Sequence, residues 1–216
     1  MTAATSIDAM AADFLTALRS GNRHDASCLV LDAVNSGRVP VRDVYLNVFR
    51  TSQQEVGRLW SVGELSVAEE HYCTAATQLI MSQLYPHIFA VARRGRTLVA
   101  TSVARELHEL PIRMVADFFE MAGWDTYYLG ASTPASDVVR TVLDQKADVV
   151  AVSATMANHV AGVKDVVDAL RAASDSKIMV GGWPFSQDPD LWQRVGADGC
   201  AENAQDAVEL AERWMT

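Results

Sequence analysis

Cysteine is scarce in this chain, and basic residues are outnumbered by acidic ones. The three cysteines, Cys28, Cys73 and Cys200, lie far apart and form no C-x-x-C pair, which argues against a zinc site or a disulfide framework and fits a reducing cytoplasm. Lys and Arg number 18 against 27 Asp and Glu, and the net charge of −9 disfavours direct binding to a nucleic acid. We interpret the one dense basic segment, Arg93–Arg96, as an interdomain linker.

Long hydrophobic runs are also missing. No segment approaches the roughly 20 apolar residues of a membrane span, and the start of the chain lacks the basic and apolar regions of a signal peptide. We therefore expect a cytoplasmic protein without a membrane partner. Half of the residues are hydrophobic, which is enough to build one large core or two small ones.

Residues 1–92 show only helical patterns. Apolar residues recur at helical spacing, and Ser66 followed by Glu69 matches a capping box at the start of the last long helix. Short connections between the helices predict an antiparallel bundle. The predicted helices are Ile7–Leu18, Arg23–Asn35, Val41–Trp60 and a segment from Ser66 to Leu84.

Residues 97–216 alternate short β-like runs with helical stretches. This alternation predicts a doubly wound parallel sheet of five strands, so the fold class is α + α/β, with a Rossmann- or flavodoxin-like second domain. The predicted strands are Thr97–Val103, Thr126–Leu129, Val149–Ser153, Ile178–Val180 and a weak Gly199–Ala201. The predicted helices are Ile112–Ala122, Pro134–Gln145, Ala157–Ala172, Pro189–Val195 and Gln205–Met215.

Candidate functional residues follow three of these strands. His108 comes after the first strand, Ser153 and Thr155 end the third, and Gly181-Gly182 follows the fourth. The carboxyl ends of parallel strands meet at one edge of the sheet, which is where ligands bind in such folds. A neutral imidazole at that edge suits a transition metal if a second group orients the ring.

Each of these residues also has an ordinary explanation. His108 can be a plain loop residue, Ser153 and Thr155 can cap the helix that begins near Ala157, and the glycine pair can be a strand-to-loop turn. Glu106 and Glu109 are both close enough in sequence to orient His108.

Together, these segments resemble the cobalamin-binding domain family. That family carries Asp-x-His-x-x-Gly, then Ser-x-Leu or Ser-x-Thr, then Gly-Gly. The resemblance implies that His108 is the lower axial ligand of cobalt and that Glu106 orients it, with Glu109 and Leu110 of the same loop among the cofactor-binding residues. This chain departs from the family in having Glu106 for Asp and Pro111 for Gly; the proline suits the first turn of the following helix.

The other two segments concern the nucleotide tail of the cofactor. In the family this tail is released from cobalt and enters a channel beside the sheet. The resemblance implies that Ser153 and Thr155 hold the tail and that Gly181 and Gly182 open the channel.

A second motif lies in the predicted bundle, where Trp60 precedes Glu70-His71 by nine intervening residues. This spacing resembles the cobalamin-dependent photoreceptors, in which a helical bundle caps the cofactor. The resemblance implies that Trp60 packs against an adenosyl group and that Glu70 and His71 contact it. Ser61 stands where those photoreceptors have a second histidine for cobalt. Without the resemblance, Trp60 is a core residue, Glu70 favours a helix's first turn, and His71 is a surface residue.

The main functional hypothesis is therefore a light sensor. Photolysis of adenosylcobalamin would shift the bundle and signal to an unknown partner, in a homo-oligomer of the stand-alone photocobilin type. That type also holds a linear tetrapyrrole such as biliverdin, for which Tyr72, Cys73, Tyr127 and Tyr128 are candidates only as aromatic or reactive residues.

Two alternatives compete with the light sensor. A corrinoid methyl carrier of a methyltransferase system pairs the same two kinds of domain, although it normally keeps the full Asp-x-His-x-x-Gly motif and needs no cap. A subunit of a cobalamin-dependent mutase would need a separate barrel chain. The sequence contains no nucleophile–base pair or acid pair in a credible pocket, so we do not expect the chain to be an enzyme by itself.

Overall fold

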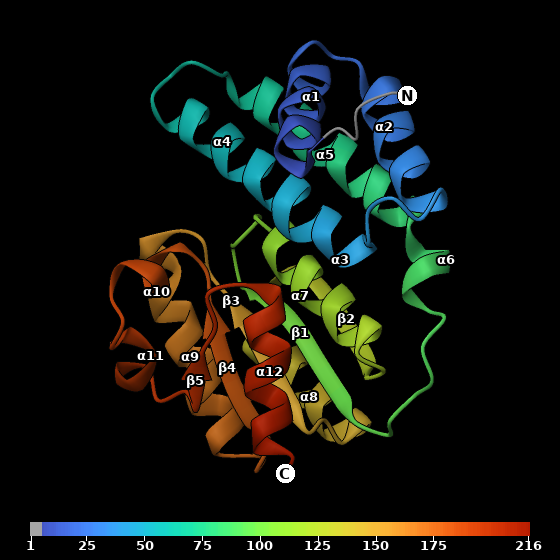
Figure 1. The fold of residues 1–216 in the computed structure, drawn as a ribbon. Helices are drawn as coiled ribbons and strands as arrows, with labels where there is room; N and C mark the ends of the chain where they lie inside the picture. Colours follow the sequence, from blue (N-terminus) through green and yellow to red (C-terminus); the bar gives the residue numbers. More distant parts are fainter. Residues whose placement is uncertain (1–5) are drawn as a thin grey trace. The chain divides into compact units, whose positions relative to one another are not determined.

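The computed structural model describes residues 6–216 and divides the chain into two units (Figure 1). The first unit ends at Phe89 and the second begins at Ala90. Among the described residues, no helix is both long enough and apolar enough to cross a membrane.

The first unit is helical throughout its described part. Ser66 and Glu69 form the full capping box that the sequence predicts. The Ser6 hydroxyl also caps the first helix, by accepting a hydrogen bond from Ala9 N. Phe14, Tyr45 and Ile80 are fully buried in its core. The elements are α1 (Ile7–Arg19), α2 (Arg23–Asn35), α3 (Val41–Asp43), η1 (Val44–Phe49), α4 (Arg50–Ser61), α5 (Val67–Gln83) and α6 (Tyr85–Ile88).

The segment predicted as one helix from Val41 to Trp60 contains a wider turn. Residues Val44–Phe49 wind as a π-helix between α3 and α4. The aromatic rings of Phe14 and Tyr45 lie 5.4 and 5.3 Å from that of Phe49, so the wide turn is packed by aromatic contacts. The apolar spacing alone does not distinguish such a turn from an ordinary helix.

The second unit is built on a five-stranded parallel sheet with strand order β2-β1-β3-β4-β5. β1 and β3 are the most buried strands: every residue of β3 and all but the first of β1 are buried. Together with the helices of the first unit, this sheet confirms the predicted fold class. The strands are β1 (Thr97–Val103), β2 (Asp125–Thr133), β3 (Val149–Ser153), β4 (Lys177–Gly181) and β5 (Gly199–Cys200).

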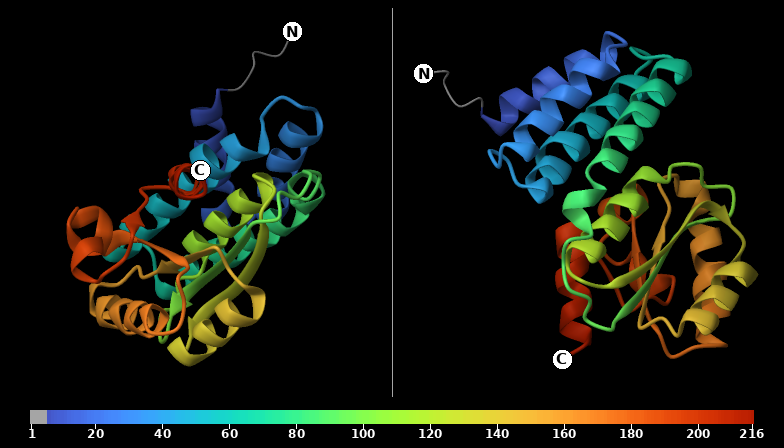
Figure 2. Two further views of the ribbon diagram at one scale, coloured as in Figure 1. Left: turned by 90° about the horizontal axis from the view of Figure 1, so that it is seen from below. Right: turned by 90° about the vertical axis from the view of Figure 1, so that its right-hand side faces the viewer.

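Helices cover both faces of this sheet (Figure 2). α7 and α12 pack together on one face, and α8 and α9 pack together on the other. This layering buries the valine-rich strands, as expected for a parallel sheet. The elements are α7 (Leu110–Met121), α8 (Ala135–Gln145), the short 3-10 turn η2 (Ala157–His159), α9 (Val160–Arg171), α10 (Trp183–Gln187), α11 (Leu191–Arg194) and α12 (Ala204–Trp214).

Two boundaries differ from the prediction. β2 continues to Thr133 instead of ending at Leu129, and its pairing with β1 shifts register after Ala100. The helix predicted over Pro189–Val195 is only the four residues of α11, while α10, which starts directly after Gly182, was not predicted. Pro184 occupies the first turn of α10, where a missing N–H costs nothing.

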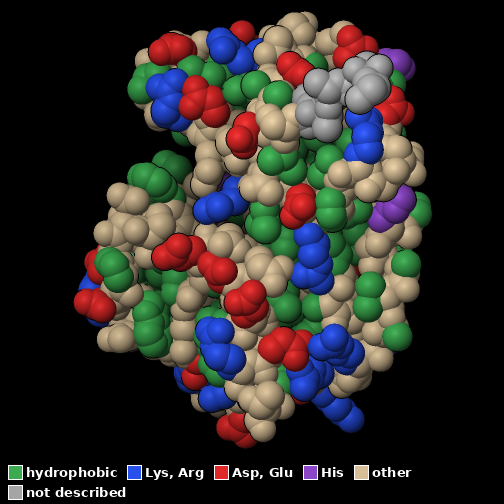
Figure 3. Space-filling model, viewed as in Figure 1, with side chains coloured by type: hydrophobic (Ala, Val, Ile, Leu, Met, Phe, Trp, Pro, Cys, Tyr) green, Lys and Arg blue, Asp and Glu red, His purple; other side chains and the backbone are tan. Residues whose placement is uncertain are grey.

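The basic segment Arg93–Arg96 is anchored to the second unit. Arg93 pairs with Glu120, and Arg94 and Arg96 both pair with Glu212 of α12. The guanidinium groups therefore face carboxylates of the same unit. Figure 3 shows that the face in view carries both Lys and Arg and Asp and Glu side chains.

Candidate functional site

The candidate site lies where the chain reverses direction across the sheet. β1 and β3 are neighbours, but β1 leads to α7 on one face and β3 leads to α9 on the other. In doubly wound sheets such a switch point opens a crevice at the carboxyl ends of the strands. The two loops that border it, residues 104–109 and 154–159, carry most of the residues discussed below.

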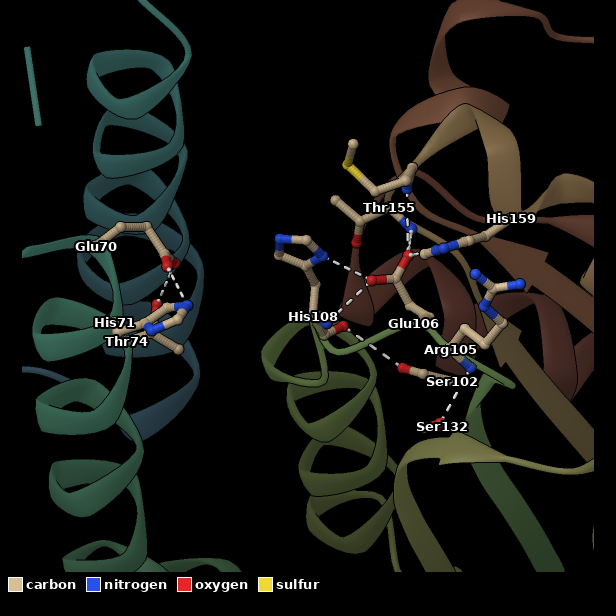
Figure 4. Close-up of polar contacts among 11 residues, drawn as sticks. Glu70, His71, Thr74, Ser102, Arg105, Glu106, His108, Ser132, Thr155 and His159 are labelled. Carbon is tan, nitrogen blue, oxygen red and sulfur yellow. Dashed lines mark hydrogen bonds and ion pairs between the residues drawn. The ribbon is translucent and has the colours of Figure 1, made fainter. Parts of the chain in front are cut away.

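Glu106 is the centre of this site (Figure 4). Its side chain is 0% exposed, and both carboxylate oxygens accept hydrogen bonds. Oε1 accepts from His108 N at 3.0 Å and from His108 Nδ1 at 2.6 Å. Oε2 accepts from Thr155 N at 2.7 Å, Met156 N at 3.2 Å and His159 Nδ1 at 2.9 Å. One carboxylate therefore joins the loops that follow β1 and β3.

These hydrogen bonds keep Glu106 ionised. Burial by itself raises the pKa of a carboxyl group, but the imidazole N–H groups of His108 and His159 and the backbone N–H groups of His108 and Thr155 outweigh burial and hold the pKa of Glu106 far below its usual range. Because a carboxylate only accepts hydrogen bonds, both imidazoles must carry a proton on Nδ1. In its neutral form, each ring then has its lone pair on Nε2.

The loop that carries Glu106 is held in an unusual backbone conformation. Ser132, at the end of β2, donates its N–H to the Glu106 carbonyl at 3.0 Å, and its hydroxyl accepts from Arg105 N at 3.0 Å. Arg105 and Ser132 both have positive φ values, 70° and 54°, which side-chain-bearing residues adopt only when their surroundings enforce it. The register shift in β2 is therefore part of what fixes the site.

His108 lies at the outer side of the buried carboxylate. Its side chain is 38% exposed, and Figure 4 shows its second ring nitrogen on the side away from Glu106. The Ser102 hydroxyl lies 3.5 Å from the His108 carbonyl. An imidazole with a fixed carboxylate behind it is the usual arrangement of a metal-binding histidine. Of the two carboxylates considered from the sequence, Glu106 supplies this orienting contact.

The start of α7 explains the neighbouring residues. Leu110 is buried, and Pro111 sits in the helix's first turn, as expected. Glu109 precedes the helix, with its carboxylate beside Gly130 of β2. Replacing the family's Gly by Pro111 is therefore compatible with this loop.

Ser153 and Thr155 do not cap the following helix, because no side chain caps η2. Ser153 is buried at the end of β3, level with Ser102 of β1 and Gly181 of β4. The Thr155 hydroxyl oxygen is buried and, within residues 6–216, has no hydrogen-bond partner. A buried hydroxyl left in this state is costly unless a bound group satisfies it.

Contacts within the chain explain why a glycine is needed in the pair Gly181-Gly182. Gly182 has φ of +106°, and a Cβ atom there would lie 2.1 Å from the Ala154 carbonyl oxygen. At Gly181 a Cβ would meet only Ala201 O, at an ordinary 3.7 Å. Close approach between the loops after β3 and β4 therefore accounts for Gly182 before any ligand is considered.

In the first unit, Trp60 lies in the last turn of α4 and is 37% exposed. Glu70 Oε1 accepts from the Thr74 hydroxyl at 2.8 Å, and its Oε2 lies 3.6 Å from His71 Nε2. The His71 side chain is 74% exposed. Ser61 donates its hydroxyl to the Arg58 carbonyl. These contacts are local to α4 and α5.

The residues considered for a second chromophore have structural contacts of their own. Tyr72 donates its hydroxyl to the Gly21 carbonyl, and burial raises the pKa of the Cys73 thiol. Tyr128 is largely buried, and burial also raises the pKa of its phenol, whereas Tyr127 is 40% exposed.

Sequence reasoning missed His159. It lies six positions after Ser153, inside what was predicted to be the first turn of a helix. Its contact with Glu106 depends on the path of the loop after β3, which no local pattern encodes. The one available signal is a histidine close to the end of a strand that borders the switch point.

Both units match known families. Residues 96–211 match a family model described as a B12 binding domain, and residues 10–85 match a second model with the same description.

Known proteins resemble the chain over most of its length. It is 27% identical to dimethylamine corrinoid protein 3 of Methanosarcina acetivorans, over 86% of this chain and 89% of that protein. It is 29% identical to a corrinoid protein of Desulfitobacterium hafniense, over 86% of this chain and 83% of that protein. The solved monomethylamine corrinoid protein of Methanosarcina barkeri shares the fold, with a TM-score of 0.83 at 24% identity, over 94% of this chain and 97% of that one.

The expectation of a light sensor is wrong. The two curated relatives are named as a dimethylamine corrinoid protein and a corrinoid protein, and neither name refers to light sensing. A solved methanol:cobalamin methyltransferase complex of Methanosarcina barkeri shares the fold, with a TM-score of 0.53 at 19% identity over 95% of this chain and 79% of that one. The features that were weighed against a methyl carrier have local causes. The longer arm of Glu106 reaches both loops, Pro111 starts a helix, and Glu70 bonds to Thr74.

Proposed function

Because this chain belongs to the B12 binding domain family, we propose that it is a corrinoid carrier of a methyltransferase system, which holds the cofactor while a partner enzyme transfers the methyl group. The names and the nearly full-length similarity of its relatives support this proposal. The observation that carries it is the buried Glu106 carboxylate bonded to His108 at the carboxyl edge of the sheet.

The described residues fit a corrinoid. We propose that His108 would hold cobalt through Nε2, since Glu106 fixes the proton on Nδ1 and stabilises positive charge on the ring. Glu109 and Leu110 stay candidates for cofactor contact from the same loop. A corrinoid, when bound, supplies a cobalt centre that can accept a methyl group and release it.

The nucleotide tail is proposed to enter beside β3. The buried, unpartnered Thr155 hydroxyl is a hydrogen-bond donor suited to a polar tail, and Ser153 lies two residues away at the strand end. We keep Gly181 and Gly182 among the proposed tail-binding residues, with Gly181 as the position where a side chain would narrow the space without disturbing the loops.

Trp60, Glu70 and His71 remain proposed cofactor contacts from the first unit. The partly exposed indole and the exposed imidazole are available for an apolar and a polar contact respectively. The adenosyl form of the cofactor and a second tetrapyrrole were tied to the light-sensor hypothesis and have no support in these observations.

The test has two stages. The purified chain is loaded with hydroxocobalamin, and its absorption spectrum is compared with that of His108→Ala. We expect binding of one corrinoid per chain and loss of imidazole coordination in the variant. The reduced, loaded chain is then incubated with labelled monomethylamine, dimethylamine or methanol and the corresponding methyltransferase, and label is sought on the protein-bound cofactor.

Each stage can contradict a different part of the proposal. A chain that binds no corrinoid, or whose His108→Ala variant keeps imidazole coordination, contradicts the assignment of the site. A chain that binds corrinoid normally but takes methyl from none of the three donors contradicts the carrier role.

A further inference from the structure

His159 contacts the same carboxylate as the proposed cobalt ligand but plays no part in the proposal above. Its Nδ1 lies 2.9 Å from Glu106 Oε2, while His108 Nδ1 lies 2.6 Å from Oε1. The His159 side chain is 18% exposed, so it is more enclosed than that of His108. Figure 4 shows the two rings approaching the carboxylate from different sides.

Two imidazoles on one carboxylate compete for its negative charge. A hydrogen bond donated to Oε2 withdraws charge from Oε1, and the contact between Oε1 and His108 Nδ1–H weakens as a result. The basicity of a metal-binding imidazole at Nε2 rises with the strength of the hydrogen bond that it donates from its other nitrogen. His159 is therefore placed to make His108 a weaker donor.

Glu106 does not depend on His159 for its position. Oε2 also accepts from Thr155 N and Met156 N, and Oε1 accepts from His108 N. These three backbone donors are fixed by the loops on both sides. Loss of the His159 N–H therefore removes charge withdrawal from the carboxylate while the carboxylate stays in place.

We infer that His159 is a positioning residue that acts through Glu106 to weaken the bond between His108 Nε2 and cobalt. This inference rests on the proposed function, in which His108 is the lower ligand. If the bound cobalt were reduced during methyl transfer, it would bind an imidazole less tightly, and His108 would have to be released. A weakened imidazole makes this release easier.

Removing His159 should change the strength of His108 ligation in opposite directions for a charge-withdrawing role and for a merely structural role. If His159 only braces the loop, then its removal loosens Glu106 and weakens ligation. If it withdraws charge, then its removal strengthens ligation. The informative variants are His159→Phe, which keeps a ring without the N–H donor, and His159→Asn, which keeps an N–H donor at about the place of Nδ1. His24→Phe, at an exposed histidine of the first unit, is the matched control.

The first measurement needs no cofactor. In the apoprotein, the proton on His108 Nδ1 is followed by NMR with ¹⁵N-labelled histidine. We expect a downfield shift in His159→Phe, because the remaining hydrogen bond to Glu106 becomes shorter, and a value near that of the wild type in His159→Asn and His24→Phe. An upfield shift, or loss of the signal through faster exchange, in His159→Phe overturns the inference.

The second measurement uses bound cobalamin in the cobalt(II) state. The fraction with a histidine nitrogen on cobalt is read from the ¹⁴N or ¹⁵N splitting in its electron paramagnetic resonance spectrum, and the cobalt(II)/cobalt(I) potential is titrated in parallel. We expect the ligation equilibrium in His159→Phe to shift on the order of 10-fold toward the ligated form, with a more negative potential. Weaker or unchanged ligation overturns the inference.

Folding defects and failure of the proposed function can both be recognised. Circular dichroism checks each variant, and His159→Leu replaces His159→Phe if the larger ring prevents folding. If the wild type itself shows no histidine nitrogen on cobalt, the proposed function fails at His108. If the wild type is ligated and only the direction of the His159 effect is wrong, the proposed function stands and this inference alone fails.

Discussion

Glu70–His71 in the first unit and Glu106–His108 in the second unit pair the same two kinds of side chain in different surroundings. The first pair is separated by 3.6 Å and its histidine is 74% exposed. The second pair lies at 2.6 Å, and its carboxylate is fully buried and accepts bonds from two loops. The chemistry of a glutamate–histidine pair therefore depends on what satisfies and encloses the carboxylate, and proximity in sequence alone does not establish a site.

The largest difference between the two pairs is expected on removal of the carboxylate. Glu106→Ala leaves several buried N–H donors without an acceptor, and we expect a loss on the order of 3–5 kcal/mol in the free energy of unfolding, as for other buried pairs. Glu70→Ala should cost about 1 kcal/mol, because the 18% exposed Glu70 side chain accepts a hydrogen bond from the Thr74 hydroxyl, which also contacts Gln53 and so keeps an acceptor. Urea denaturation of the two variants measures both values, and equal losses would contradict the comparison.

One glycine of each unit allows a second test. Gly182→Ala combines a positive φ with a clash against Ala154 O, and we expect a loss of about 2–3 kcal/mol. Gly63, in the turn after Trp60, also has positive φ, but a Cβ there meets nothing within 4 Å. Gly63→Ala should therefore cost only about 1 kcal/mol. Similar thermal midpoints for the two variants would show that the loops after β3 and β4 can move apart at Ala154.

Acid titration tests how much the ionised Glu106 carboxylate contributes to stability. The folded-state pKa of Glu106 is depressed, so its contribution to stability is complete above the unfolded-state pKa of about 4.3 and is lost as the pH falls toward the folded-state value. We expect Glu106→Gln to be less stable than the wild type by about 1–3 kcal/mol near pH 5. The difference in unfolding free energy between the wild type and Glu106→Gln should decrease progressively toward pH 3. Denaturation curves at several acidic pH values test this, and a gap that widens in acid would reverse the sign.

The smallest expected effect concerns Thr155. Its hydroxyl oxygen is buried without a partner within the described residues, so Thr155→Val should change the free energy of unfolding by less than about 0.5 kcal/mol, or raise it slightly. Binding of hydroxocobalamin, measured by spectral titration, should weaken at the same time. A large loss of stability would mean that the hydroxyl has a structural partner.

Most of the fold could be predicted because its signals are local. The valine-rich runs of β1 and β3 and the capping box at Ser66 identify their elements directly. The last residues of β2 could not be predicted, since Gly130 to Thr133 carry no apolar alternation and are held by pairing to β1 across register shifts. α10 is too short to show a helical period.

The site was predictable only in part, because some of its contacts join residues that lie far apart in the sequence. Glu106 and His108 are two residues apart, so their contact could be expected from the sequence, whereas His159 reaches Glu106 from 53 positions away. The motif of Trp60, Glu70 and His71 led to the wrong function because its spacing resembles that of the photoreceptors, while the named relatives are corrinoid proteins. The spacing of a sequence motif identifies candidate residues, but their chemistry also depends on how buried their side chains are in the fold.

The two outer strands of the sheet bear on how copies of this protein can associate. β5 has two residues, and the opposite strand, β2, is distorted where its pairing with β1 slips. Neither offers the long, flat row of free amide groups on which another chain could add a strand. If the protein forms the homo-oligomer expected from its sequence, the short β5 and the distorted β2 disfavour a continuous sheet between copies.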